Sequence, residues 1–136
     1  MLLMKLKNEE KFAFLCLAYY IANIDGEFEK EEKDIIEEYC AEMGIESREY
    51  HTNKFNLEET LQKIKTPKSQ KIVLLELMIL IHSDDKFHRF EQNVIDKIAN
   101  YYHISQNKIN TYSQWGKMAS ALYSQGKLFL EEETPL

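Results

Sequence analysis

The chain contains little glycine and proline, four and two residues respectively in a length of 136. Because strand-and-turn architectures depend on both residues, their scarcity favours helices joined by short connections. Hydrophobic residues make up 44% of the chain and charged residues 29%, which is the composition of a folded globular protein. A chain of this length buries enough apolar surface to fold without disulfides or metals, so we expect one all-α domain.

Cysteine is also scarce, and Cys16 and Cys40 do not form a C-x-x-C pair. Both lie in apolar helical patterns, where free thiols behave as small core residues, and this favours a reducing compartment. The apolar run of residues 12–22 is well short of the ~20 residues that span a bilayer. Glu9 and Glu10 precede it where a signal peptide would be positively charged. We therefore expect a cytoplasmic protein without a membrane span.

Positive charge is sparse in the first half of the chain. Residues 1–59 contain 15 acids and 7 bases, whereas residues 60–136 contain 8 acids and 10 bases. Binding to nucleic acid requires clustered lysine and arginine. The one basic cluster is short and has no interleaved aromatic residues, so a solvated face is favoured over a nucleic-acid site. Its members are Lys63, Lys65, Lys68 and Lys71.

Catalytic motifs are missing as well, since the chain has no G-x-G-x-x-G, Walker, G-x-S-x-G or H-E-x-x-H sequence. His82, His88 and His103 surround one turn, but their spacing favours solvated or hydrogen-bonded histidines over zinc ligands. We expect a protein that is not an enzyme. A carboxylate-dependent hydrolase is the catalytic alternative, although the sequence indicates no nucleophile for it.

The main feature that is present is an internal repeat with an offset of 59 residues. Residues 12–45 align with residues 71–104, so that Asp25 matches Asp84 and Glu32 matches Glu91. Each unit is an apolar run, an acidic turn and an amphipathic stretch, the pattern of a helix-turn-helix pair. We predict a single-domain bundle of six to seven helices over residues 1–130, followed by a disordered acidic tail at 131–136.

Several helix ends are predicted from capping chemistry. The expected caps are Asn8, Asn56, Thr66 and Ser105 at N-terminal ends, and Gly44 at a C-terminal end. The second helices of the two units are expected at about 30–43 and 89–102, and a short helix follows Asn56 through Lys65. The last helix is expected from Ser105 to about Leu130, and Gly116 is the position where it can break.

The acidic turns allow two interpretations. In the first, each Asp accepts hydrogen bonds from turn amides and each Glu, seven residues later, caps the next helix. In the second, Asp25, Glu32, Asp84 and Glu91 converge and bind Ca²⁺ or Mg²⁺, which prefer carboxylate oxygens. Glu29 and Asp85 are secondary ligand candidates for this site. The spacing is not that of an EF-hand, because the glycine follows Asp25 directly.

The stretches "ANIDGEFEKEEKDIIEEYCAEMGI" and "IHSDDKFHRFEQNVIDKIANYYHI" resemble the paired acidic motifs of the TerB-like, tellurite-resistance-associated family. The resemblance implies an all-helical fold, no known catalysis and metal binding at the acidic positions. It also implies roles in bacterial tellurite, phage and stress defence through partner proteins. By position, Asp25, Glu32, Asp84 and Glu91 match the acidic pairs of the family. The second turn departs from the pattern, since Asp85 stands where the family usually has glycine.

Two further features bear on function. Glu76 interrupts the apolar run "IVLLELMIL", and because a buried carboxylate is costly, it is expected either beside Lys or Tyr partners or in a functional pocket. Aromatic residues near the last helix are expected to pack it onto the bundle, or else to form a partner-binding face. They are Tyr101, Tyr102, Tyr112, Trp115 and Tyr123.

The predicted function is a non-enzymatic TerB-like module in a bacterial stress or tellurite-resistance-associated assembly, tuned by a divalent cation. The alternative is a ligand-free protein-interaction or dimerisation domain. The sequence does not identify the protein partner, and a homodimer is one option.

Overall fold

A computed structural model describes residues 2–24, 30–46, 55–83, 89–133 and 135. These residues form six α-helices and one short 3-10 helix, η1, with no strand among them, which confirms the all-α prediction. The elements are η1 (Leu3–Lys5), α1 (Asn8–Asn23), α2 (Lys30–Met43), α3 (Leu57–Gln62), α4 (Pro67–Ile81), α5 (Arg89–Tyr102) and α6 (Gln106–Glu131). None of these helices combines the length and the apolar character needed to cross a membrane.

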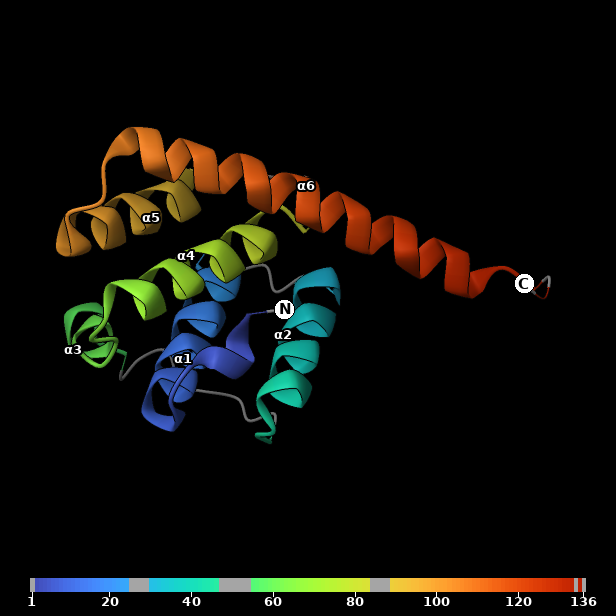
Figure 1. Cartoon of the computed structure of the whole chain (residues 1–136), viewed down its shortest axis with the longest axis horizontal. Helices are drawn as coiled ribbons and strands as arrows, with labels where there is room; N and C mark the ends of the chain where they lie inside the picture. The colour runs from blue at the N-terminus through green and yellow to red at the C-terminus, as the bar shows by residue number, and fades with distance from the viewer. Residues whose placement is uncertain (1, 25–29, 47–54, 84–88, 134, 136) are drawn as a thin grey trace.

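The helix α4 lies at the centre of the bundle, between α1 and α2 on one side and α5 and α6 on the other (Figure 1). Its most extensive partner is α6, and α1 packs against α2, α3 and α4. The sequences of α1 and α4 explain this placement, because a helix that is apolar on nearly all faces is stable only where other helices surround it. Their fully buried members include Phe14, Leu17, Leu74, Leu77 and Leu80.

By contrast, α2 and α5 each bury one apolar face, as their 3.6-residue periodicity predicts. The buried residues are Ile36, Tyr39, Cys40 and Met43 on α2, and Val94, Ile95, Ile98 and Ala99 on α5. Tyr39 meets Phe14 of α1 edge to face, with ring centroids 5.0 Å apart. Neither Cys40 nor the half-buried Cys16 takes part in a disulfide.

The second helices of the two repeat units, α2 and α5, begin and end at equivalent positions. The bounds of α5 are those of α2 moved by the predicted 59 residues, and each helix ends in a left-handed residue, Gly44 at φ 70° and His103 at φ 58°. A backbone amide then returns to the last turn in both cases. These hydrogen bonds join Ile45 N to Cys40 O at 3.0 Å and Ile104 N to Ala99 O at 2.9 Å. The matches support the internal repeat, which remains an inference from the sequence pattern.

Capping side chains account for three of the four α-helix N-terminal ends whose capping residues are described. Asn56, Thr66 and Ser105 accept hydrogen bonds from backbone amides three residues later, as predicted. The prediction that Asn8 caps α1 is wrong, because Lys7 is the capping residue and its amide donates to Glu10 Oε1 at 2.9 Å. The helix after Asn56 is also shorter than expected, since it ends at Gln62.

The helix α6 is continuous through Gly116, so the break that the sequence allows at this residue does not occur. A Cβ atom on Gly116 would lie 2.4 Å from Met78 Cβ, and the missing side chain therefore allows α4 and α6 to pack closely. Beyond this crossing, the C-terminal half of α6 extends away from the body of the molecule (Figure 1). Glu131 is the last residue of this helix, which therefore includes the first residue of the predicted tail.

Candidate functional site

The predicted acidic corners are only partly described. Asp25, Glu29, Asp84 and Asp85 lie outside the described residues. Glu32 and Glu91 occupy the third positions of α2 and α5 and are only 4% and 3% exposed. Among the residues whose placement is described, no group of three or more His, Cys, Asp or Glu side chains could hold a metal ion. The cation site therefore stays a prediction.

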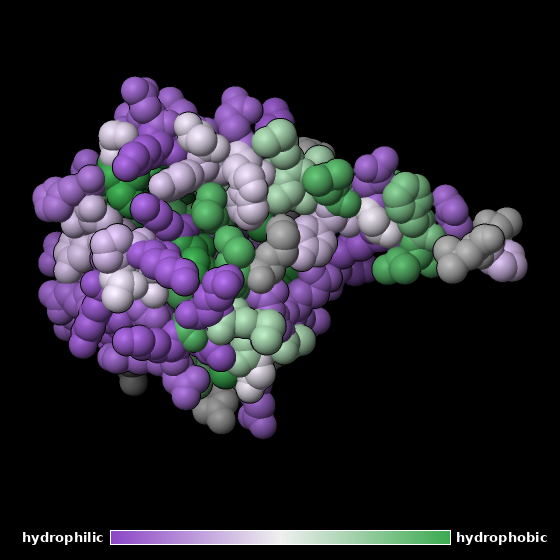
Figure 2. Space-filling view, in the orientation of Figure 1, coloured by the Kyte–Doolittle hydropathy of each residue, from purple (hydrophilic) through white to green (hydrophobic). Residues whose placement is uncertain are grey.

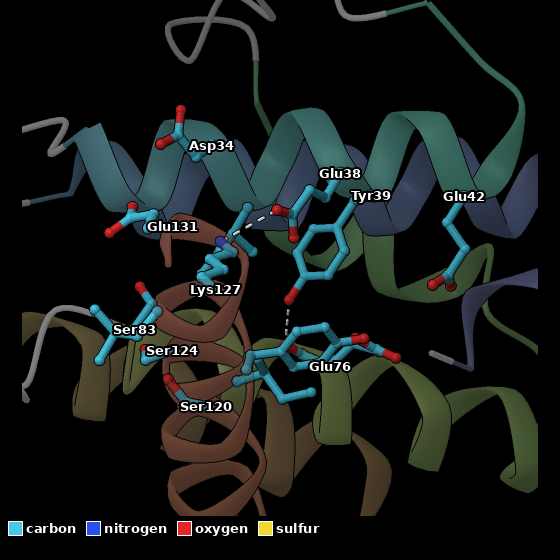
Figure 3. A pocket seen from close by; sticks show the side chains of 14 residues that line it. Asp34, Glu38, Tyr39, Glu42, Glu76, Ser83, Ser120, Ser124, Lys127 and Glu131 are labelled. Carbon is cyan, nitrogen blue, oxygen red and sulfur yellow. Dashed lines mark hydrogen bonds and ion pairs between the residues drawn. The ribbon is translucent and has the colours of Figure 1, made fainter. Parts of the chain in front are cut away.

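A cavity of about 400 Å³ lies between α2, α4 and α6 (Figure 3). Carboxylates dominate its charged lining, and among the lining residues that the structure describes Lys127 is the one with a cationic side chain. The carboxylates are Asp34, Glu38, Glu42, Glu76 and Glu131, and the hydroxyl groups are those of Tyr39, Ser83, Ser120, Tyr123 and Ser124. The cavity therefore presents negative charge and hydrogen-bonding oxygens from three helices.

Glu76 is held at the floor of this cavity and is 1% exposed. Its Oε1 accepts a hydrogen bond from the backbone amide of Leu2 at 2.7 Å, and its backbone carbonyl accepts one from the Tyr39 hydroxyl at 2.8 Å. Glu42 similarly accepts from the amide of Leu3 at 2.9 Å. The Glu76 side chain therefore lines a pocket, and the tyrosine bonds to its backbone carbonyl rather than to its carboxylate. The carboxylate partner, the Leu2 amide, was not predicted from the sequence.

The tyrosines of the cavity stay protonated at neutral pH. Burial raises the pKa of Tyr39 well above its usual value, and the carboxylates of Glu76 and Glu42 raise it further because a phenolate would face like charge. The pKa of Tyr123 is raised by the same causes, burial first.

One ion pair lies at the edge of this cavity. Lys127 Nζ lies 3.1 Å from Glu38 Oε1, and since both side chains are about half exposed, this ion pair is weak.

A second hollow, an open groove of about 820 Å³, runs along the outer face of α6 and is bordered by Glu38 of α2. Its apolar lining forms one line at helical spacing, which we call the α6 stripe: Trp115, Met118, Ala119, Leu122, Gly126 and Leu130. Leu122 is 68% exposed and Leu130 is 86% exposed. Figure 2 shows apolar surface on the projecting end of the molecule, whereas hydrophilic surface covers most of the body in this view.

Sequence reasoning did not identify the apolar residues of the α6 stripe beyond Trp115. The aromatic residues were expected to pack the last helix onto the bundle or to form a partner-binding face, and Tyr112 does lie against the core. Tyr123 is instead 43% exposed and lines the groove together with Trp115. The signal that could have revealed the stripe is the recurrence of apolar residues every three or four positions from Trp115 to Leu130.

The histidine prediction is confirmed for His82. Its Nε2 atom lies 2.9 Å from Ser113 Oγ on α6, and its backbone carbonyl accepts a hydrogen bond from Ser120 Oγ at 3.2 Å. His82 therefore helps to join the end of α4 to α6. His88 lies outside the described residues.

Comparisons with protein-family models, with curated proteins and with solved structures give no match to this chain. The TerB-like resemblance therefore rests on the sequence pattern alone. Function has to be inferred from the surfaces of the molecule, and above all from α6.

Proposed function

We propose that this chain is a non-enzymatic protein-interaction domain whose binding surface is the α6 stripe. The observation that supports this function is the exposure of Met118, Leu122 and Leu130 in one line, at 59%, 68% and 86%. Burying a leucine side chain contributes about 1.5–3 kcal/mol, so covering this line stabilises a complex substantially. Contiguous apolar surface on a soluble domain is typical of a protein-binding site.

The setting that we propose for this interaction is a bacterial stress or tellurite-resistance-associated assembly. The TerB-like resemblance implies action through partner proteins rather than catalysis. An exposed apolar surface on a small helical domain suits such a role.

A photocrosslinking residue on the α6 stripe tests the interaction in cells. With p-benzoylphenylalanine at position 122, we expect discrete covalent adducts that identify the partner by mass. The matched control places the same residue at position 110, which is exposed on α6 but does not line the groove. Adducts from position 122 and none from position 110 are the expected result. If positions 118, 122 and 130 all yield no adduct, the stripe is not a binding surface.

A second candidate function is the binding of Ca²⁺ or Mg²⁺ by Asp25, Glu32, Asp84 and Glu91. The observation that favours it is the burial of Glu32 and Glu91 at matching positions of α2 and α5. Carboxylate oxygens are the ligands that Ca²⁺ and Mg²⁺ prefer, and the predicted repeat relates the two positions. Such a cation would tune the same interaction domain.

The cation proposal predicts a rise in the thermal midpoint of chelator-treated protein when Ca²⁺ or Mg²⁺ is added. A cation at 100 times its dissociation constant adds about 2.7 kcal/mol to the free energy of unfolding. Asp25→Asn should abolish the rise, whereas the control Asp34→Asn, an exposed acid of α2, should keep it. If neither Ca²⁺ nor Mg²⁺ changes the midpoint, helix capping remains as the role of the acidic corners.

A further inference from the structure

We infer that the occupant of the α6 stripe is a second copy of this chain, whose α6 lies antiparallel to the first across a two-fold axis. This inference rests on the proposed function and names its partner. A two-fold arrangement uses the same surface on both copies and closes at two subunits. The surface must therefore be complementary to itself in shape, size and charge.

The two halves of α6 differ in how much of their surface the rest of the same chain covers. From residue 121 to residue 131 every side chain is exposed, apart from the half-buried Gly126. The preceding half packs on α4 through Gly116 and Ser120, and its outer edge leaves an open groove beside Trp115 and Ala119. An antiparallel pair places the projecting half of each copy over the groove of the other. Each copy then covers the surface that the other leaves open.

The sizes of the side chains agree with this pairing. A two-fold axis between Leu122 and Tyr123 sets Trp115 against Leu130 of the second copy. It also sets Ala119 against Gly126, so that the two smallest residues of the stripe meet. A Cβ atom built on Gly126 would have no neighbouring atom within 4 Å, which leaves space for a second helix to approach closely.

Charge decides between antiparallel and parallel packing. No basic residue lies in the last turn of α6, which ends at Glu131 and is followed by Glu132 and Glu133. The C-terminal end of a helix already has a partial negative charge, so these acids concentrate negative charge there. Antiparallel packing brings this end near the exposed Lys117 of the second copy. Parallel packing would place three glutamates against three glutamates, which repel one another.

Sedimentation equilibrium of the purified chain between about 1 and 200 µM tests the association. We expect the mass to rise from the 16.2 kDa of one chain toward twice that value. Leu122→Lys should raise the dissociation constant at least about tenfold, since it places two charges at the centre of the interface. Met4→Lys is the matched control, because Met4 is an apolar residue of η1 that is 72% exposed and lies off the stripe. It should leave the dissociation constant unchanged.

Cysteine crosslinking under mild oxidation tests the orientation. Leu122→Cys should form a disulfide-linked dimer, because the two copies of position 122 lie beside the axis. Leu130→Cys should not, because its two copies are about 22 Å apart along antiparallel helices. Crosslinking of both variants would show parallel packing and overturn the inference. A monomer at every concentration, or association unaffected by Leu122→Lys, would also overturn the inference. In that case, a photocrosslinked adduct of a different protein at position 122 would leave the proposed function standing.

Discussion

Replacing Phe14 with alanine should lower the free energy of unfolding by about 3–5 kcal/mol. The Phe14 ring is fully buried and meets Tyr39 edge to face, so the variant loses apolar burial and leaves a cavity between α1 and α2. Phe12→Ala is the matched control on the same helix, because Phe12 is 48% exposed. We expect it to cost less than about 1 kcal/mol. Urea denaturation followed by circular dichroism measures both variants, and equal losses would contradict the placement of α1.

Gly116→Ala and Gly126→Ala should change stability in opposite directions, although both replace a glycine within α6. Alanine at position 116 would meet the Cβ and the backbone carbonyl carbon of Met78 at 2.4 and 2.7 Å, so α4 and α6 must separate. The expected loss is about 1–3 kcal/mol, despite the better helix propensity of alanine.

Gly126→Ala meets no neighbouring atom, and it should therefore stabilise the monomer by up to about 1 kcal/mol. Thermal unfolding at low protein concentration compares the two variants without a contribution from association. A stabilised Gly116→Ala variant would show that α4 and α6 do not cross closely at this residue.

Local chemistry explains what the sequence predicted well. The all-α class and the bounds of α2 and α5 follow from apolar periodicity, because one face of each helix must be buried. Asn56, Thr66 and Ser105 were identifiable as caps because their side chains bond to amides three residues away. These signals need no knowledge of the tertiary structure.

Packing between distant segments explains the unbroken helix at Gly116 and the cavity that the sequence did not predict. Gly116 looks like a helix breaker in isolation, yet its role depends on Met78 of α4, which lies close to it only in the folded bundle. The cavity around Glu76 likewise combines α2, α4 and α6 with the amide of Leu2, and no sequence spacing links these segments.

The candidate site illustrates the same distinction. Acidic pairs are visible in sequence because their members are only seven residues apart, and Glu32 and Glu91 do occupy matching buried positions. The α6 stripe has the spacing of any helix face that packs into a core. Only the structure shows that Leu122 and Leu130 on this face are solvent-exposed.

Amide hydrogen exchange of α6 as a function of protein concentration tests the central claim, that the α6 stripe is an interface between two copies of this chain. A short helical segment with few tertiary contacts is marginally stable, so its amides exchange quickly when it is uncovered. We expect residues 121–131 to exchange quickly in dilute solution and slowly when the protein is concentrated, while α4 remains slow throughout. Fast exchange of residues 121–131 at every concentration would contradict the claim.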